Sequence, residues 1–258
     1  MTPAKKLAIV LGVSWRHPSG DTSSKGDRDA DDRAAGRHEL ASSAEYYRLL
    51  NELTRQQRGG LHSAPLLLHS FDFAQVAALQ AAGRWDAAGD LLARAAKGLE
   101  AAGAELLLIG TNTMHKVAPA VAAAVSVPVL DIIDATAERV RAAGLTKVGL
   151  LGTRFTMEDG FYQQRMAAHG LPVLVPGEAD RRVVHQVIYQ ELCRGVCSPA
   201  SRRAYREVTG QLAAAGAEGI ILGCTEIELL IGQADSPVAV FPTTRIHAQA
   251  AIAAATDE

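Results

Sequence analysis

The sequence predicts an α/β protein of two similar lobes, each with a parallel-sheet core, related by a pseudo-twofold axis with the active site in the cleft between them. Short apolar runs, typical of buried parallel strands, alternate along the chain with segments of helical periodicity. The chain also contains an internal repeat. The sequence Ala-Ala-Gly-Ala-Glu at residues 101–105 recurs at residues 214–218, an offset of 113 residues, and an apolar run follows each copy.

A second pair of segments extends this repeat to the start of each half. Residues 6–12 (Lys-Leu-Ala-Ile-Val-Leu-Gly) resemble residues 147–152 (Lys-Val-Gly-Leu-Leu-Gly), with Gly12 and Gly152 140 residues apart. This separation exceeds the first offset by 27 residues, close to the length of a polar stretch at about residues 16–40. That stretch has almost no apolar side chains to bury, so we expect a mobile insertion in the first half.

The periodicity predicts each element in turn. Strands are expected over residues 7–11, 65–68, 105–109, 127–130, 147–151, 173–175, 219–222 and 238–241. Ser42 and Ser43 are good caps for a helix that Gly59 and Gly60 would end. Further helices are expected over residues 73–82, 85–102, from about 114, 135–143, 158–169, 181–192, 201–215 and 246–255. The predicted units are a first lobe (1–126), a second lobe (127–236) and a C-terminal segment (237–258) that returns to the first lobe.

Composition excludes several classes of protein. The chain has 258 residues, 48% of them hydrophobic, and a formal net charge of −2, so no basic field favours nucleic acid or an anionic membrane. The apolar run after Lys5 and Lys6 is short and lacks a cleavage pattern, and no run approaches the roughly 20 residues that span a bilayer. Three cysteines are too few for a disulfide framework. A cytoplasmic protein without a nucleic-acid or membrane partner is expected.

Small polar residues follow four of the predicted strands. They are Ser14, the Thr111–Thr113 segment, Thr153 and the Cys224-Thr225 pair. Ligands of parallel α/β sheets collect at the carboxyl ends of strands, and hydroxyl and amide groups at helix starts suit a small carboxylate. Thr111 and Cys224 differ by the repeat offset, so they would face one ligand from opposite sides. This geometry favours removal of a proton from one face of a carbon and its return to the other.

The titratable groups near these two residues suggest how protons could move. A thiolate with a pKa near 8.5 or below is a workable base at neutral pH, whereas a threonine hydroxyl needs help. His115 and Glu226 are the nearest candidates by sequence. A cysteine after a buried strand can also be a core residue, which is the interpretation favoured for Cys193 and Cys197. Their spacing matches neither a Cys-x-x-Cys redox motif nor a zinc site.

Several motifs resemble those of the aspartate/glutamate racemase family. They are Thr-Asn-Thr-Met-His-Lys at 111–116, Gly-Cys-Thr-Glu-Ile at 223–227, Leu-Gly-Thr-Arg-Phe-Thr-Met at 151–157, and the segments 45–51 and 60–63. The resemblance covers nearly the whole chain except the insertion. It implies a homodimeric amino-acid racemase that uses neither pyridoxal phosphate nor a metal. Such enzymes place two opposed acid/base residues, usually cysteines, in a cleft between two lobes.

The resemblance also implies roles for single residues. Cys224 matches the second family cysteine, and Thr111 stands where the first usually stands, as it does in part of the family. Asn112, Thr113 and Thr225 match positions that hold the carboxylate and amino groups of the substrate, and Gln80 matches a glutamine near it. Ser14 lies in the motif Gly-Gly-Met-Ser-Trp, which here is Leu-Gly-Val-Ser-Trp and leads into the insertion.

The working hypothesis is that Cys224 removes the α-proton of aspartate or glutamate and that Thr111, helped by His115 or a water, protonates the opposite face. Two alternatives remain open. One is a one-cysteine decarboxylase or isomerase of small dicarboxylates. The other is a non-catalytic racemase-like domain that binds a small acid.

Overall fold

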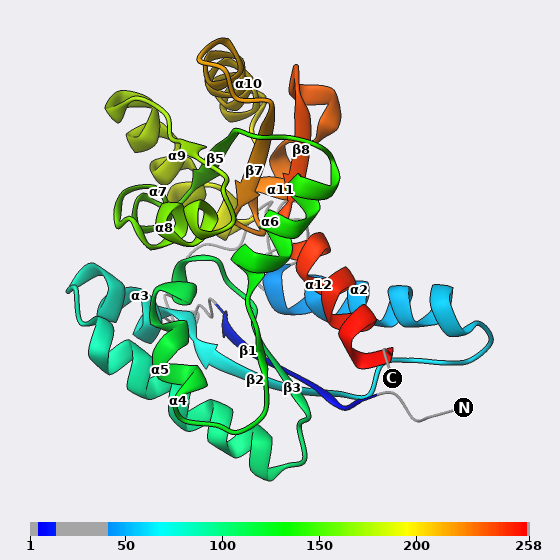
Figure 1. Ribbon diagram of the computed structural model, residues 1–258. Helices are drawn as coiled ribbons and strands as arrows, with labels where there is room; N and C mark the ends of the chain where they lie inside the picture. Colours follow the sequence, from blue (N-terminus) through cyan, green and yellow to red (C-terminus); the bar gives the residue numbers. More distant parts are fainter. Residues whose placement is uncertain (1–4, 14–40, 257–258) are drawn as a thin grey trace, which may run out of the picture.

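The computed structural model describes residues 5–13 and 41–256, and the predicted insertion and Ser14 lie outside them. Two four-stranded parallel sheets form its core, with strand orders β2-β1-β3-β4 and β6-β5-β7-β8 (Figure 1). The strands are β1 (Leu7–Val13), β2 (Leu66–Asp72), β3 (Leu106–Ile109), β4 (Val129–Leu130), β5 (Val148–Gly152), β6 (Val173–Leu174), β7 (Gly219–Gly223) and β8 (Ala239–Pro242). The two sheets have the same strand order, which confirms the predicted fold class.

Helices cover both faces of each sheet. The α-helices are α2 (Ala41–Arg58), α3 (Phe73–Ala81), α4 (Trp85–Ala101), α5 (Ala118–Ala122), α6 (Ile132–Ala142), α7 (Arg154–Glu158), α8 (Phe161–Ala168), α9 (Glu178–Gln190), α10 (Pro199–Ala214), α11 (Ile227–Leu230) and α12 (Thr243–Thr256). Short 3₁₀ helices are η1 (Thr113–Val117), η2 (Leu192–Arg194) and η3 (Gln233–Asp235). None of these helices is long and apolar enough to cross a lipid bilayer.

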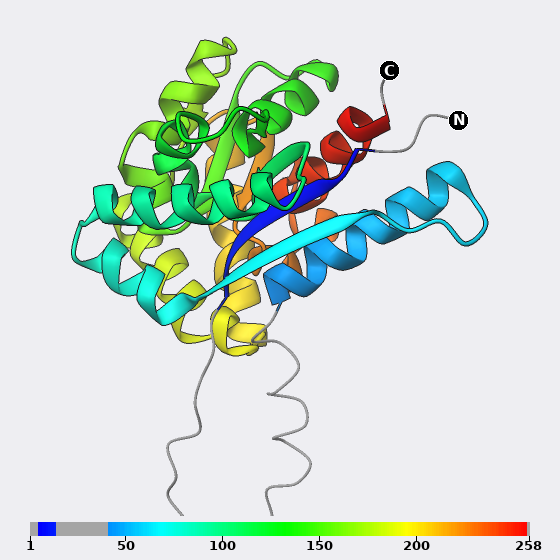
Figure 2. The same ribbon diagram turned by 90° about the horizontal axis from the view of Figure 1, so that it is seen from below.

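The first sheet has one apolar core on each face. Alternate residues of β1 point to opposite sides, because successive side chains of a strand alternate. Ala8 and Val10 pack with the helices α4 and α5, whereas Leu7 and Ile9 pack with α2 and α12. Figure 2 shows α2 and α12 side by side on that second face.

The second sheet is built the same way. Leu151, Ile220 and Leu222 pack with α9 and α10 on one face. On the other face, Val148, Leu150 and Ile221 pack with α6, α8 and the start of α12. Both sheets are therefore buried on both faces, which explains the continuous apolar runs of their strands.

The sequence repeat corresponds to a repeated set of contacts. In the first lobe, Lys6 N donates to Glu105 Oε2 (2.7 Å) and Glu105 N donates to Lys6 O (2.9 Å). In the second, Lys147 N donates to Glu218 Oε2 (3.2 Å) and Glu218 N donates to Lys147 O (2.9 Å). The glutamate of each copy thus aligns the starts of the two central strands. The repeated glycine before it has φ of 90° at Gly103 and 94° at Gly216, a conformation that favours glycine.

The chain crosses between the sheets twice. It leaves the first sheet after β4, which pairs with β3, and leaves the second after β8, which pairs with β7. The crossovers therefore follow Leu130 and Pro242. Helix α12 then packs against α2 and α6. The division into lobes at 1–126, 127–236 and 237–258 stays a prediction.

Two predicted helices differ in detail. The helix expected over 158–169 begins three residues later, as α8, because Gly160 has φ of 79° and caps its start, and the short helix α7 before it was not expected. The helix expected from about residue 114 begins as the 3₁₀ helix η1, and α5 follows with Pro119 in its first turn. Both differences occur where the local backbone departs from α-helical geometry.

Candidate functional site

A cavity of about 60 Å³ lies between the two lobes. This volume holds only a few water-sized groups, which limits it to a small ligand. Its walls come from the ends of β3 and β7 and from helices α3 and α9 on either side. The lining residues are Phe73, Val76, Gln80, Thr111, Asn112, Thr113, Met114, Thr153, Ile188, Tyr189, Cys193, Gly223, Cys224, Thr225 and Glu226.

Cys224 follows β7 directly, at the carboxyl end of that strand. Close packing fixes this strand end: a Cβ on Gly223 would lie 2.9 Å from the carbonyl oxygen of Leu151 on the neighbouring strand. The Cys224 thiol donates to Glu226 Oε2, with Sγ and Oε2 2.9 Å apart. Cys224 and Glu226 thus form a hydrogen-bonded thiol–carboxylate pair at this strand end.

The environment of Cys224 favours the neutral thiol. Burial raises the pKa of Cys224 well above its ordinary value, and the negative charge of Glu226 raises that pKa further. The thiolate that the sequence suggested is therefore not the resting form of this group. Any reaction that needs a thiolate must first move the thiol proton, and Glu226 Oε2 already accepts its hydrogen bond.

Thr111 follows β3 as Cys224 follows β7, and it lines the same cavity. Its hydroxyl oxygen accepts a long hydrogen bond from Met114 N (3.4 Å). Its carbonyl oxygen lies 2.8 Å from His115 Nδ1. The sheets therefore bring the two predicted acid/base residues to one cavity, from opposite lobes.

His115 does not have the role that its sequence position suggested. Its Nε2 accepts from the backbone N–H of Ile132 (3.1 Å), so Nδ1 carries the proton and donates to the Thr111 carbonyl. Both ring nitrogens are engaged with backbone groups, which leaves neither for the Thr111 hydroxyl. Burial also lowers the pKa of His115, so the ring is neutral. A proton relay from His115 to the Thr111 hydroxyl is not what this geometry provides.

Asn112 is a buried polar residue of the cavity wall. It is 3% exposed and donates from Nδ2 to Thr243 Oγ1 (2.9 Å). Its Oδ1 is buried and has no hydrogen-bond partner among the residues that the structure describes. A buried acceptor without a partner is costly, and a ligand N–H in the cavity would satisfy it.

Thr113 belongs to a cluster of three hydroxyl groups that crosses the lobes. Its Oγ1 lies 2.9 Å from Thr153 Oγ1 and 3.1 Å from Thr156 Oγ1. The other two oxygens are 3.1 Å apart. Thr113 comes from η1 of the first lobe, whereas Thr153 caps α7 of the second lobe and Thr156 lies within that helix. The cluster holds the two sides of the cavity together.

Two further residues predicted to contact substrate also line the cavity. Thr225 Oγ1 accepts from the Thr244 hydroxyl (3.3 Å). Gln80 donates from Nε2 to Met114 Sδ (3.1 Å) and accepts at Oε1 from Tyr189 OH (3.3 Å). Thr225 and Gln80 therefore stand at the cavity wall with defined partners. Ser14 lies outside the described residues, so its role in substrate binding stays a prediction.

The cavity wall also includes an aromatic pair that the sequence did not indicate. Tyr189 of α9 stacks on Phe73 of α3, with ring centroids 6.4 Å apart and planes inclined by 24°. Each residue lies in an ordinary helical pattern, which is also typical of core residues, so the sequence carried no distinguishing signal. Cys193, expected to be a packing residue, packs in the second-lobe core and also lines the cavity. Within residues 5–13 and 41–256, no group of three potential metal-ligating side chains is found.

The protein therefore has two α/β lobes with one small cavity between them. A thiol and a hydroxyl line this cavity from equivalent strand ends, an arrangement suited to contacting one small ligand from two sides. The Asp/Glu/Hydantoin racemase family model matches residues 39–251. The chain belongs to this family.

Comparison with known proteins adds individual relatives. A crystal structure from Yersinia pestis, described as a candidate Asp/Glu racemase, is 44% identical with a TM-score of 0.81, covering 98% of this chain and 100% of that one. An aspartate racemase homologue from Pyrococcus horikoshii is 31% identical with a TM-score of 0.76, with the same coverage. Glutamate racemase of Thermus thermophilus is 28% identical over 172 residues, 64% of this chain and 58% of that protein.

Proposed function

We propose that the protein is a cofactor-independent amino-acid racemase that acts on aspartate or glutamate. The observation that carries this proposal is the position of Thr111 and Cys224, which line one cavity from equivalent strand ends of the two lobes. Family membership supports an isomerase acting on a small amino acid. Inverting a carbon requires one group on each of its faces, and these two side chains supply them.

The proposed reaction begins at Cys224. Because its resting form is a thiol bonded to Glu226, the thiol proton first passes to the Glu226 carboxylate. The resulting thiolate removes the α-proton of the amino acid. The Thr111 hydroxyl then gives its proton to the opposite face and regains one from water, while Glu226 returns its proton to the solvent. Because the α-carbon is held between two fixed groups, their orientation lowers the barrier to proton transfer.

The polar residues around these two groups would hold the substrate. The unpartnered Oδ1 of Asn112 suits the α-ammonium group, because an ammonium is a donor without acceptor capacity. The hydroxyls of Thr225 and Thr113 can donate to the α-carboxylate, whose negative charge grows when the proton leaves. The stacked rings of Phe73 and Tyr189 line the cavity and would keep water from the carbanion.

The test is the exchange of α-protons in D₂O, followed by NMR for each enantiomer of aspartate and glutamate. Asparagine and glutamine, which lack the side-chain charge, are assayed beside them. Wild type should exchange and invert at least one acid. Cys224→Ala should lose exchange at the Cys224 face by at least about a hundredfold, and Thr111→Ala should lose inversion while retaining that exchange. Cys224→Ala exchanging as fast as wild type would refute the proposal.

One observation also favours a second candidate function. The group opposite Cys224 is a hydroxyl, which is far less acidic than a thiol, so the site is chemically asymmetric. A one-cysteine decarboxylase or isomerase of small dicarboxylates needs only one strong acid/base group. Turnover of malonate- or maleate-type substrates without exchange of any amino acid would favour this alternative. Tight binding of aspartate without any turnover would favour a non-catalytic binding domain.

A further inference from the structure

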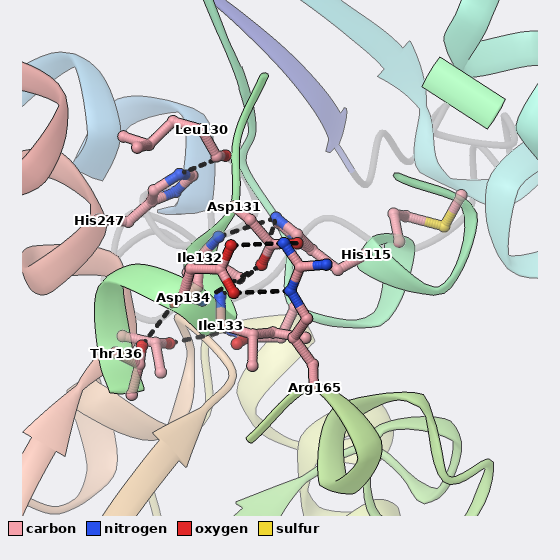
Figure 3. A network of polar contacts seen from close by, with 12 residues as sticks. His115, Leu130, Asp131, Ile132, Ile133, Asp134, Thr136, Arg165 and His247 are labelled. Atoms are coloured by element: carbon pink, nitrogen blue, oxygen red, sulfur yellow. Dashed lines mark hydrogen bonds and ion pairs between the residues drawn. The ribbon is translucent and has the colours of Figure 1, made fainter. Parts of the chain in front are cut away.

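The first crossover between the lobes is held by two buried histidines. The carbonyl of Leu130 accepts from His247 Nε2 (3.1 Å), and the amide of Ile132 donates to His115 Nε2 (3.1 Å). His247 lies on α12 and His115 on η1. Figure 3 shows the two rings on either side of the short segment Leu130–Ile132, which joins β4 to α6. The ring centroids are 6.0 Å apart.

The backbone partners determine the tautomer of each ring. A backbone amide can only donate and a carbonyl can only accept. His115 is therefore protonated on Nδ1, and His247 on Nε2, with Tyr46 OH donating to His247 Nδ1 (2.8 Å). Burial lowers the pKa of both rings, that of His247 to about 3. Two neutral imidazoles of opposite tautomer thus flank one crossover.

His115 connects this crossover to the turn that carries Thr111. The Ile132 amide donates to Nε2, and Nδ1–H on the same rigid ring donates to the Thr111 carbonyl. The second crossover reaches the neighbouring residue of the same turn. Asn112 Nδ2 donates to Thr243 Oγ1, and the Thr243 hydroxyl donates to Leu222 O at the end of β7 (2.8 Å). Both interlobe connections therefore bond to the turn after β3.

We propose that His115 is a positioning residue that ties Thr111 to the crossover, so that the relative orientation of the lobes sets the placement of Thr111 opposite Cys224. This inference deepens the proposed function and rests on Thr111 being the proton donor of the second face. The two hydrogen bonds of His115 act in series. Breaking either bond releases the tether as completely as breaking both.

Three substitutions separate the two bonds. A glutamine amide can place an acceptor near the Nε2 position, so His115→Gln keeps the bond to Ile132 and loses the bond to Thr111. An asparagine amide matches the Nδ1 position, so His115→Asn does the reverse. His115→Phe loses both. His169→Gln is the matched control, because His169 lies beside the same crossover but bonds to Asp134 (2.8 Å) and not to Thr111.

The activity readout is the ratio of inversion to α-proton exchange at the Cys224 face. A tether in series predicts that all three His115 variants lower this ratio by a similar factor, at least about tenfold, while exchange at the Cys224 face changes less than about threefold. The control keeps the wild-type ratio. Loss of inversion and exchange in equal proportion, or a wild-type ratio in either single-bond variant, would overturn the proposal.

A second readout works even without turnover, and so separates this proposal from the proposed function. Backbone amide exchange is measured at Ile132 and at Met114, whose amide bonds to the Thr111 hydroxyl. The proposal predicts that His115→Asn speeds exchange at both amides by at least about tenfold, although its bond to Thr111 is retained. Faster exchange at Ile132 alone would show two independent bonds and refute the tether. If the wild-type protein exchanges the α-proton of no amino acid, the proposed racemase function is refuted, but the amide-exchange measurement still tests the tether.

Discussion

Cys224 and Glu226 form a thiol–carboxylate pair, with Sγ donating to Oε2 across 2.9 Å at the carboxyl end of β7. The pair has two opposed consequences. The carboxylate accepts the thiol hydrogen and can receive its proton, yet its charge raises the pKa of the thiol beyond the effect of burial. At rest, the carboxylate charge lowers the fraction of Cys224 that is thiolate. During the proposed reaction, the same carboxylate can accept the thiol proton.

Glu226→Gln should therefore change thiol reactivity and turnover in opposite directions. Removing the negative charge lowers the pKa of Cys224, so alkylation of this thiol by iodoacetamide at pH 8 should speed up several-fold. Racemisation should fall at least tenfold because the proton acceptor is lost. Peptide mass spectrometry measures the alkylation, with the exposed Cys197 as an internal control. Slower alkylation together with unchanged turnover would contradict the proposed pairing.

Thr111→Cys should make the site more symmetric. A thiol has an ordinary pKa near 8.5, far below that of an alcohol, so it is a better acid and base at neutral pH. We expect α-proton exchange at the Thr111 face to rise at least about tenfold, with exchange at the Cys224 face little changed. Thr111→Ser, which keeps the hydroxyl, is the control and should behave like wild type. An equal change at both faces would argue against separate roles.

Thr156→Val should destabilise the folded protein by about 1–3 kcal/mol, because the fully buried hydroxyl bonds to Thr113 of the first lobe and to Thr153 of its own lobe. Urea unfolding measures this free energy. Thr54→Val is the matched control: Thr54 is also buried, but its hydroxyl partner among the described residues is Leu50 O, one turn earlier in α2. Its cost should be the smaller of the two, and the reverse order would show that the hydroxyl cluster contributes little.

Glu228→Gln should stabilise the protein in a pH-dependent way. Burial raises the pKa of Glu228 to about 8, although Thr244 N donates to its Oε1 (3.0 Å). The unfolded chain loses this proton near the ordinary pKa of about 4.3, so the folded state binds the extra proton between those values. Stability of wild type therefore falls as pH rises through this window, by at most about 1.4 kcal/mol per pH unit from this group.

The gain from Glu228→Gln should accordingly be small at pH 4.5, grow up to pH 8 and then level off. Urea unfolding of both proteins at pH 4.5, 6, 7 and 8.5 measures the difference. Glu207→Gln, an exposed glutamate on α10, is the control and should give a flat difference. A stabilisation that does not depend on pH would show that the carboxyl group is not protonated in the fold.

Much of the fold could be predicted from the sequence because its determinants are local. The apolar runs before Gly110 and Gly223 identify buried strands, and the repeated Ala-Ala-Gly-Ala-Glu predicts two equivalent units. The same repeat predicts that Thr111 and Cys224 occupy equivalent strand ends. Gly160, by contrast, sets the start of α8 through a backbone angle that the helical pattern of its neighbours conceals.

The sequence by itself determined the α/β class, the repeat and the residue types available at the strand ends, because each depends on periodicity and spacing along the chain. Only the tertiary structure decided the protonation states and hydrogen-bond partners of those residues. Burial beside Glu226 makes Cys224 a neutral thiol, and the amide of Ile132, 17 residues away in sequence, turns His115 from a proton relay into a link to the crossover. A pKa and a tautomer depend on groups that meet only after folding, so neither can be read from a residue and its neighbours in sequence.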